Sequence, residues 1–271
     1  EGCEELEYIS LPALESIPNR LCNRCKSLRN ISMSSAASID FQAFASCESL
    51  ESVTLPGRLI SLGEQAFAWC YGLEFVSCGI SLNNIGEHAF PPANVAANAF
   101  EGASIDQCLL FTESPEAYRN VAPWNSFKKV MSRVFVKDGA EYSIYADSPE
   151  YCAFKKLNDA SVITYDIPSK TSCEELEFEV KVIFAEAFKE LPSLQQVSIP
   201  SGVESLQGHA FVDCPSLTDV AMVDGLYGIS SYAFDGCNAL THLSLPATVE
   251  AAYSIARNCN ALTSIDVAPA N

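Results

Sequence analysis

The sequence predicts an α/β repeat fold, a solenoid in which short strands and short helical turns stack coil upon coil. Three observations predict it. Ala-Phe dipeptides mark a period of 22 or 23 residues in two blocks, a cysteine follows most of these dipeptides by three residues, and alternating apolar residues follow the cysteine. The Ala-Phe dipeptides end at Phe44, Phe67, Phe90, Phe100, Phe188, Phe211 and Phe234.

Two series of residues give the register of the coils. Neighbouring members are 22 or 23 residues apart, as expected if each coil repeats one unit. The unit runs C-x-x-L-x-x-V-x-L-P and then I-x-x-x-A-F-x-x-C, and it is nearly complete from Cys47 to Cys70. The series are Cys3, Cys25, Cys47 and Cys70 in the first block and Leu191, Cys214, Cys237 and Cys259 in the second.

Each unit begins with a predicted strand. In the unit that starts at Cys47, Val53 and Leu55 alternate with Thr54, so the apolar side chains face the interior and Thr54 faces outward. Pro56 has no amide hydrogen and marks the end of the strand. The later A-F-x-x-C segment predicts a short helical turn, in which the phenylalanine fills the interior and the alanine allows neighbouring coils to approach closely.

The period breaks after residue 90 in a segment that closes the first block. A second Ala-Phe is followed by an apolar strand-like run over 108–111. A helix then starts, with Ser114 as the N-cap and Pro115 at the first helical position. Trp124 and Phe127 follow at a spacing that suits packing under this helix.

These features divide the chain into two expected domains. Residues 1–130 form the first repeat block, with the closing segment over 91–130. Residues 131–271 form the second block, with irregular strands over 131–185 and regular repeats over 186–271. The irregular strands are expected over 134–136, 142–145, 161–167 and 176–183.

Composition excludes several classes of partner. The net charge of −18 and pI near 4.4 argue against nucleic acid, which needs clustered Lys and Arg, and against anionic lipid. The charge keeps the surface soluble, faces a basic protein patch or binds cations loosely. No run of 18 apolar residues is present, so no membrane insertion is expected. Because both ends fall inside repeats, we expect a piece of a longer protein, with any signal peptide outside it.

Repeat positions account for most of the residues that suggest chemistry. Seven of the twelve cysteines occupy the ladder position, where parallel side chains about 4.8 Å apart are poorly placed for disulfides, so we expect buried thiols. Cys22 and Cys25 form a C-x-x-C, but both hold packing positions and no His is nearby, so zinc is not expected. The carboxylates over 174–179 alternate with apolar residues as on a half-exposed strand, which disfavours a metal site.

No catalytic residue or cofactor is expected, and the chain is predicted not to be an enzyme. His88 and His209 occupy the same variable repeat position, and His242 lies on an outward strand position. A nucleophile elbow, a phosphate-binding loop and a paired-carboxylate motif are all lacking from the sequence.

The repeat unit resembles the BspA-like, Treponema pallidum-type leucine-rich repeat family. The resemblance rests on the units from Cys47 to Cys70 and from Leu191 to Cys214, and it extends to the closing segment over 99–127 and the restart over 142–168. It implies a right-handed leucine-rich-repeat solenoid. It also implies a cell-surface or secreted protein of bacteria or protists that adheres to host or matrix proteins or to other cells.

Outward strand positions and their neighbours are the candidate partner-binding residues. Tyr8, Phe75 and His242 are the larger side chains expected to contact a partner, whereas the small residues also suit any exposed strand. The candidates are Tyr8, Ser10, Arg29, Ser32, Glu51, Thr54, Phe75, Ser77, Gln196, Ser198, Asp219, His242, Ser244 and Asp266.

The sequence therefore predicts a non-enzymatic, monomeric protein that binds a protein partner, with host or matrix adhesion as the expected role. Two alternatives stay open. The chain could be a structural spacer in a larger surface protein, or it could be an intracellular scaffold, which unpaired thiols favour.

Overall fold

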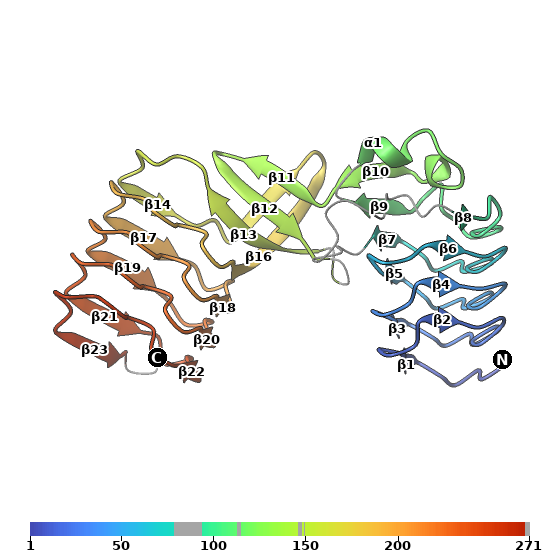
Figure 1. The fold of residues 1–271 in the computed structure, drawn as a ribbon, viewed down its shortest axis with the longest axis horizontal. Helices are drawn as coiled ribbons and strands as arrows, with labels where there is room; N and C mark the ends of the chain where they lie inside the picture. Colours follow the sequence, from blue (N-terminus) through green and yellow to red (C-terminus); the bar gives the residue numbers. More distant parts are fainter. Residues whose placement is uncertain (79–93, 113–114, 146–147, 149, 269–271) are drawn as a thin grey trace. The chain divides into compact units, whose positions relative to one another are not determined.

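The computed structural model describes residues 1–78, 94–112, 115–145, 148 and 150–268. The chain divides into two compact units, which we call unit 1 (residues 1–133) and unit 2 (residues 134–271) (Figure 1). Each unit is built from stacked coils whose short strands pair in parallel with the equivalent strands of the next coil. The predicted repeat solenoid is confirmed.

Unit 1 has two rows of strands and a short helical segment at one end. The first row is β1 (Tyr8–Ser10), β3 (Asn30–Ser32), β5 (Ser52–Leu55), β7 (Phe75–Cys78), β9 (Leu109–Thr112) and β10 (Lys129–Ser132). The second row is β2 (Ser16–Ile17), β4 (Ser38–Ile39), β6 (Ser61–Leu62) and β8 (Asn94–Val95). The helices are α1 (Pro115–Tyr118) and the 3-10 helix η1 (Trp124–Ser126).

Unit 2 begins with irregular strands and continues as regular coils. The irregular part is β11 (Val134–Lys137), β12 (Ala140–Ile144), β13 (Tyr151–Leu157), β15 (Lys170–Cys173) and β16 (Leu176–Ile183). The first row of the coils is β14 (Thr164–Asp166), β17 (Gln196–Ile199), β19 (Asp219–Met222), β21 (His242–Leu245) and β23 (Ser264–Val267). The second row, which continues from β16, is β18 (Ser205–Leu206), β20 (Gly228–Ile229) and β22 (Ala251–Ala252).

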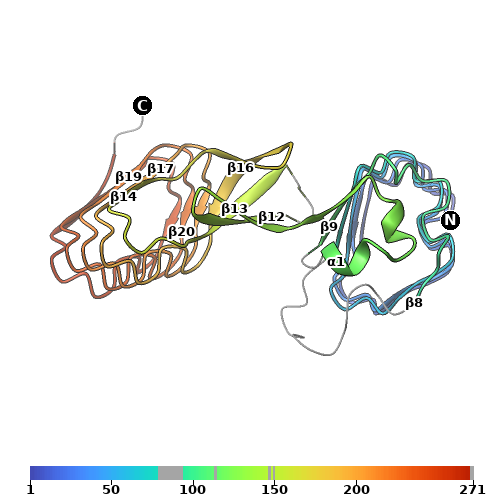
Figure 2. The ribbon, with the colours of Figure 1, turned by 90° about the horizontal axis from the view of Figure 1, so that it is seen from above.

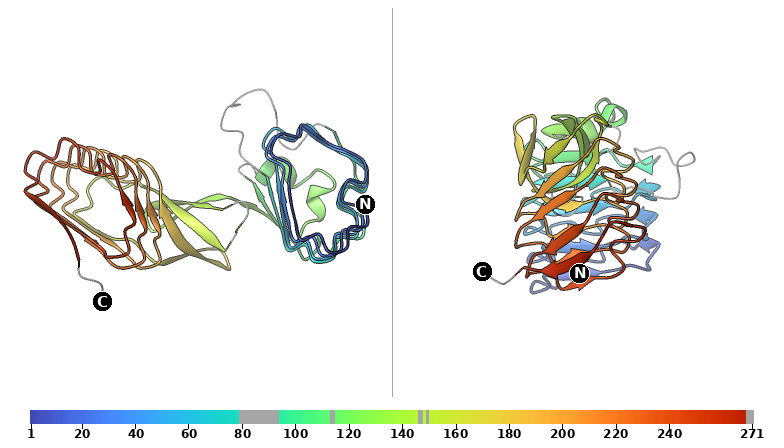
Figure 3. Two further views of the ribbon diagram at one scale, coloured as in Figure 1. Left: turned by 90° about the horizontal axis from the view of Figure 1, so that it is seen from below. Right: turned by 90° about the vertical axis from the view of Figure 1, so that its left-hand side faces the viewer.

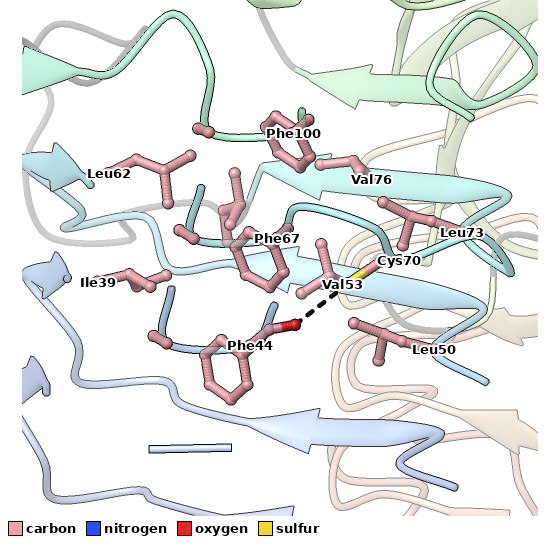
Figure 4. Close-up of a cluster of buried hydrophobic side chains, with 14 of the residues drawn as sticks. Ile39, Phe44, Leu50, Val53, Leu62, Phe67, Cys70, Leu73, Val76 and Phe100 are labelled. Carbon is pink, nitrogen blue, oxygen red and sulfur yellow. Dashed lines mark hydrogen bonds between the residues drawn. The ribbon is translucent and has the colours of Figure 1, made fainter. Parts of the chain in front are cut away.

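The repeat phenylalanines stack along the centre of both units, as the sequence predicted. In unit 1 the ring centroids of Phe44 and Phe67 are 5.3 Å apart, and Phe100 continues the stack at 5.6 Å (Figure 4). In unit 2 the ring of Phe211 lies 4.6 Å from Phe188 and 5.3 Å from the next repeat phenylalanine. Phe90 and His88 lie outside the described residues.

The ladder cysteines keep their thiols and use them to join neighbouring coils. All twelve cysteines lie in the described part of the chain, and none is in a disulfide bond. The Sγ of Cys70 donates to the carbonyl oxygen of Phe44 at 3.2 Å, and Cys237 donates to Phe211 at 3.1 Å (Figure 4). Burial is confirmed for five of the seven ladder thiols, whereas Cys259 is half-buried and Cys3 is exposed, because no earlier coil of the described chain packs against the coil of Cys3. Cys70 and Cys237 also satisfy the carbonyl of the repeat phenylalanine one coil earlier.

The Ala-Phe segments form turns in which successive backbone amides donate alternately to the next coil and to their own turn. The amides of Phe44 and Ser46 donate to the next coil, at 2.9 Å to Ala66 and 2.8 Å to Ala68. The amide of Ala45 instead donates within its own turn to Gln42 at 3.3 Å. The predicted short helical turn is therefore wrong, because Gln42 and Ser46 have φ values of 53° and 58°, outside the right-handed helical region, and the backbone is satisfied without a helix.

The closing segment covers the end of the unit 1 interior. Figures 2 and 3 show α1 lying across the opening of the stacked coils. Tyr118 on this helix packs edge-on against Trp124, with ring centroids 5.5 Å apart, and Trp124 stacks on Phe127 at 6.1 Å. The helix starts at Pro115 as predicted, while its expected N-cap, Ser114, lies outside the described residues.

The irregular strands of unit 2 agree only in part with the bounds predicted from the sequence. The strand predicted over 176–183 is confirmed as β16. The strand predicted over 161–167 is too long, because only Thr164–Asp166 forms a strand. The reason is a side-chain turn before it, in which both the amide and the hydroxyl of Ser161 donate to Asp159, at 2.9 and 2.6 Å.

Candidate partner-binding surface

The first row of strands in unit 2 presents one exposed face, which we call the unit 2 strand face. Alternate side chains point outward because the strands are extended and paired in register. Val197 and Val220 point inward between them and are buried. The exposed or half-buried members of the face are Thr164, Asp166, Gln196, Ser198, Asp219, Ala221, His242, Ser244, Ser264 and Asp266.

Several residues of this face contact one another. His242 is the centre of one group, because its Nδ1 lies 2.8 Å from the Ser264 hydroxyl and its Nε2 lies 3.5 Å from a carboxylate oxygen of Asp266. At the other end of the face, Ser198 donates to Asp166 at 2.5 Å. These contacts hold polar side chains in fixed positions while leaving the face open to solvent.

The equivalent surface of unit 1, the unit 1 strand face, carries the remaining candidates. Tyr8 and Ser10 are exposed on β1, and Ser32 and Thr54 are half-buried on β3 and β5. Arg29 and Glu51 precede these strands and form an ion pair, with the guanidinium 3.3 Å from the carboxylate.

Ser77 is a correction to the sequence prediction. Its side chain was expected to face a partner, but it is 1% exposed. The strands of the closing segment place Phe111 next to Ser77 in register and Met131 next to Phe111, and both are buried. Phe75 is half-buried and stacks on Phe111 at 6.2 Å. The outward row therefore changes from polar to apolar near β9, and Ser77 is unavailable for binding.

Four residues of the unit 2 strand face, Thr164, Asp166, Ala221 and Ser264, are not among the candidates predicted from the sequence. Thr164 and Asp166 lie on β14, and the interval of 32 positions from Asp166 to Ser198 hides their equivalence, because the regular interval is 22 or 23. Ser264 lies two residues before Asp266 and aligns with His242, so the strand alternation could have identified it.

The carboxylates of β16 pair with lysines. Lys170 lies 2.8 Å from Glu177, and this contact raises the pKa of Lys170. Lys181 lies 3.1 Å from Glu204 and 3.2 Å from Glu179, and these partners raise its pKa as well. Within the described ranges, no three or more His, Cys, Asp and Glu side chains gather as a metal site would require.

The buried cysteines are poor nucleophiles. Burial raises the pKa of Cys22, Cys78, Cys108 and Cys152 to about 12, and it raises the pKa of Cys214 to about 11. Thiols with such pKa values stay protonated at neutral pH, and a protonated thiol reacts slowly. Cys22 and Cys25 are both buried in the interior of unit 1.

Comparison with known proteins identifies the repeat. Residues 1–108 and 163–271 match the BspA type leucine rich repeat region, in six copies. A search of curated proteins found no match. Among the helices of the described residues, none is both long and apolar enough to cross a membrane.

Solved structures of bacterial leucine-rich repeat proteins are similar to the chain. One from Bacteroides capillosus is 26% identical with a TM-score of 0.46, over 51% of this chain and 99% of that one. A leucine rich cell surface protein from Faecalibacterium prausnitzii is 21% identical with a TM-score of 0.36, over 99% and 74%. The T. pallidum leucine-rich repeat protein is 22% identical with a TM-score of 0.37, over 48% and 70%.

The match to the repeat region covers most of the chain, and both units carry its stacked coils. The repeat supports a role in protein interaction, with the strand faces as the candidate surface. The chain belongs to the BspA type leucine rich repeat family.

Proposed function

We propose that this chain is a non-enzymatic, monomeric surface or secreted protein that binds a protein partner, with adhesion to host, matrix or neighbouring cells as its role. The observation that carries the proposal is the unit 2 strand face. It presents rows of exposed polar side chains, and a row of buried apolar side chains lies between them. The buried row packs the coils together, so the exposed side chains are available to a partner.

The chemistry of the face favours a polar and partly basic partner. Gln196, Asp219 and His242 lie in one row, and each is exposed. Asp166 and Asp266 lie in the adjacent row. Because the chain has a net charge of −18, a partner with a basic patch gains from long-range attraction, whereas an acidic partner is repelled. Surface location and adhesion rest on the family resemblance of the repeat.

The test measures binding of the whole chain to immobilised fibronectin, laminin and collagen. A triple variant, Gln196→Ala with Asp219→Ala and His242→Ala, removes the exposed row. A control triple variant, Lys189→Ala with Glu204→Ala and Glu250→Ala, removes three exposed side chains outside the strand face and changes the net charge by the same amount.

An adhesin should bind at least one of these proteins saturably. We expect the strand-face variant to weaken that binding at least tenfold, which corresponds to about 1.4 kcal/mol, while the control variant binds as the wild type does. Absence of saturable binding, or equal binding by both variants, would contradict the proposal and favour a spacer.

A further inference from the structure

A cavity of about 440 Å³ lies beside β14, at the start of the regular coils of unit 2. Three walls enclose it. Lys137, Asp138 and Tyr142 come from β11, β12 and the turn between them, and residues 170–172 come from β15. All three residues of β14 line the remaining side.

On the edge of β14 that does not pair with β17, the backbone groups of Thr164 and Asp166 bond to no other described residue. The carbonyl of Ile163 and the amide of Ile167 pair with the β17 side, at 2.7 Å to Gln195 and 3.0 Å to Ser198. Because neighbouring residues of a strand direct their amides and carbonyls to opposite sides, Tyr165 also faces β17, whereas Thr164 and Asp166 face away from it. Within the described part of the chain, β14 is an edge strand.

The strand position next to β14 is vacant because the strand that precedes β14 in the sequence pairs in the other sheet. In the regular coils each strand of the first row has the strand of the previous coil beside it, as β17 has β14. The strand before β14 in the sequence, β13, pairs instead with β12 and β16 in the other sheet (Figure 1). The usual neighbour of a first-row strand is therefore absent from this position, and the cavity lies there.

The charges around the cavity favour a basic occupant. Lys170 and Glu177 neutralise each other in their ion pair, at 2.8 Å. The remaining charged residues of the lining are Lys137, Asp138 and Asp166, which sum to −1. Asp166 accepts one hydrogen bond from Ser198, and its carboxylate can accept more. A peptide with a Lys or Arg side chain beside Asp166 would be attracted both by the negative charge of the cavity and by the negative net charge of the chain.

We propose that the free edge of β14 binds an extended, basic peptide segment of the protein partner as an added strand. The two amides and two carbonyls of Thr164 and Asp166 pair with the peptide backbone, and Asp166 pairs with its basic side chain. Pro168 has no amide hydrogen, so the edge ends there and takes about three residues of peptide. This inference rests on the proposed protein-binding function, and it specifies one contact within it.

The first test needs no variant. A phage-displayed library of random heptapeptides is selected on the full chain, and backbone amide exchange is followed by NMR with and without each selected peptide. Before binding, the amides of Thr164 and Asp166 should exchange much faster than those of Tyr165 and Ile167. We expect a bound peptide to slow the exchange of Thr164 and Asp166 at least tenfold. The inference is overturned if no selected peptide slows these two amides.

The second test removes one edge amide. Thr164→Pro deletes an N–H that bonds to no other residue in the described part of the chain, so the urea midpoint should stay near that of the wild type. Selected basic peptides should bind this variant at least tenfold more weakly, and Asp166→Asn should weaken them about threefold. Equal binding to the wild type and to Thr164→Pro would overturn the inference.

The strand-face variant separates this inference from the proposed function. If matrix-protein binding is lost in the triple variant at Gln196, Asp219 and His242 but kept in Thr164→Pro, the protein-binding function stands and the edge inference fails. If neither variant changes matrix binding, while peptides still protect the β14 amides, the edge inference stands and the proposed adhesive surface fails.

Discussion

The same repeat position is filled by different chemistry in unit 1 and unit 2. In unit 1, Arg20, Gln42 and Gln65 have φ values of 55°, 53° and 55°, and their side chains form a hydrogen-bonded row. The Nε of Arg20 donates to Gln42 at 3.0 Å, and Gln42 donates to Gln65 at 2.7 Å. The row ends where Gln65 donates to Glu101 at 2.7 Å.

Unit 2 has aromatic rings in two neighbouring coils at this position, which Glu186 occupies in the coil before them. His209 and Tyr232 have φ values of 61° and 64°, close to those of unit 1, but their rings stack with centroids 5.4 Å apart. The guanidinium of Arg257 lies 5.5 Å from the centre of the Tyr232 ring. The stacking of coils therefore determines the backbone conformation and the interior side chains. The surface side chains can differ between the units, provided that each interacts favourably with the equivalent side chain one coil away.

The largest expected effect tests whether the interiors of the two units contribute alike. Phe67→Ala and Phe211→Ala each remove a fully buried ring from the middle of a stack. Each variant should lose about 3–5 kcal/mol of unfolding free energy, because the lost burial and the cavity both cost stability. Urea unfolding measures the loss, and hydrogen exchange locates it.

The location of the loss decides the comparison. We expect Phe67→Ala to lower amide protection mainly within residues 1–133, and Phe211→Ala mainly within residues 134–271. In a repeat array each coil depends chiefly on its neighbours. Equal loss of protection in both units from either variant would show that the two units are not separate in stability.

The thiol-to-carbonyl bonds give the next largest effect. Cys237→Ala removes a buried side chain and leaves the Phe211 carbonyl without its thiol donor, so we expect a loss of about 2 kcal/mol. Cys70→Ala is the matched change in unit 1, where the bond to Phe44 is 3.2 Å. Urea midpoints should fall by similar amounts for both.

Serine separates the hydrogen bond from the packing. Cys237→Ser keeps a donor near the Phe211 carbonyl, so it should be less destabilising than Cys237→Ala. If the serine variant is equally or more destabilised, the hydrogen bond contributes little, and the ladder cysteines act only as small apolar side chains.

The interior could be predicted from the sequence because every coil solves the same packing problem. Phe211, Cys214 and most of their repeat equivalents recur where a stacked coil needs an interior side chain, so their spacing identifies burial except near the ends of the array, where Cys3 is exposed and Cys259 is half-buried. The outward positions could not be predicted equally well. Ser77 has the right spacing, yet β9 and β10 bring Phe111 and Met131 beside it, and that segment lies outside the repeat.

The start of unit 2 was harder still, because its strands do not follow the repeat interval. The sequence alone gives no way to know that β13 pairs with β16, and therefore none to know that the edge of β14 is open. The missed residues Thr164 and Asp166 belong to this segment. Sequence periodicity thus predicts strand pairing where coils stack regularly, but it does not predict the pairing where a strand joins the other sheet, as β13 does.

Alkaline pH should weaken both units through their buried thiols. Burial raises the pKa of Cys214 from 9.0 to about 11, so this thiol stays protonated in the folded chain while it ionises in the unfolded chain. The stability it contributes is fully present below pH 9 and is lost as the pH rises to about 11, at about 1.4 kcal/mol per pH unit. Urea midpoints from pH 8 to 11 measure this.

The variant Cys214→Ala isolates the contribution of one thiol. It should be less stable than the wild type at pH 8 but should fall less steeply as the pH rises. Cys108→Ala is the counterpart in unit 1, since burial raises the pKa of Cys108 to about 12. Identical pH slopes for the wild type and both variants would show that thiol ionisation does not cause the alkaline loss.

The smallest expected effect concerns the surface rows that distinguish the units. Gln65→Asn shortens the side chain and breaks its bonds to Gln42 and Glu101, while asparagine tolerates the positive φ of 55° that alanine would resist. We expect a loss of about 1 kcal/mol, because both bonds are near the surface and water replaces them in part. Tyr232→Asn makes the same change in unit 2, where it removes the ring that stacks on His209.

The two variants respond differently to salt if the rows differ as their contacts suggest. The unit 1 row joins a guanidinium to a carboxylate through two amides, so part of its contribution should be screened by 1 M NaCl. The stacked rings of unit 2 depend on apolar contact, which salt does not screen. We therefore expect added salt to reduce the effect of Gln65→Asn and leave that of Tyr232→Asn unchanged. Equal salt dependence would remove the distinction between a polar and an aromatic row.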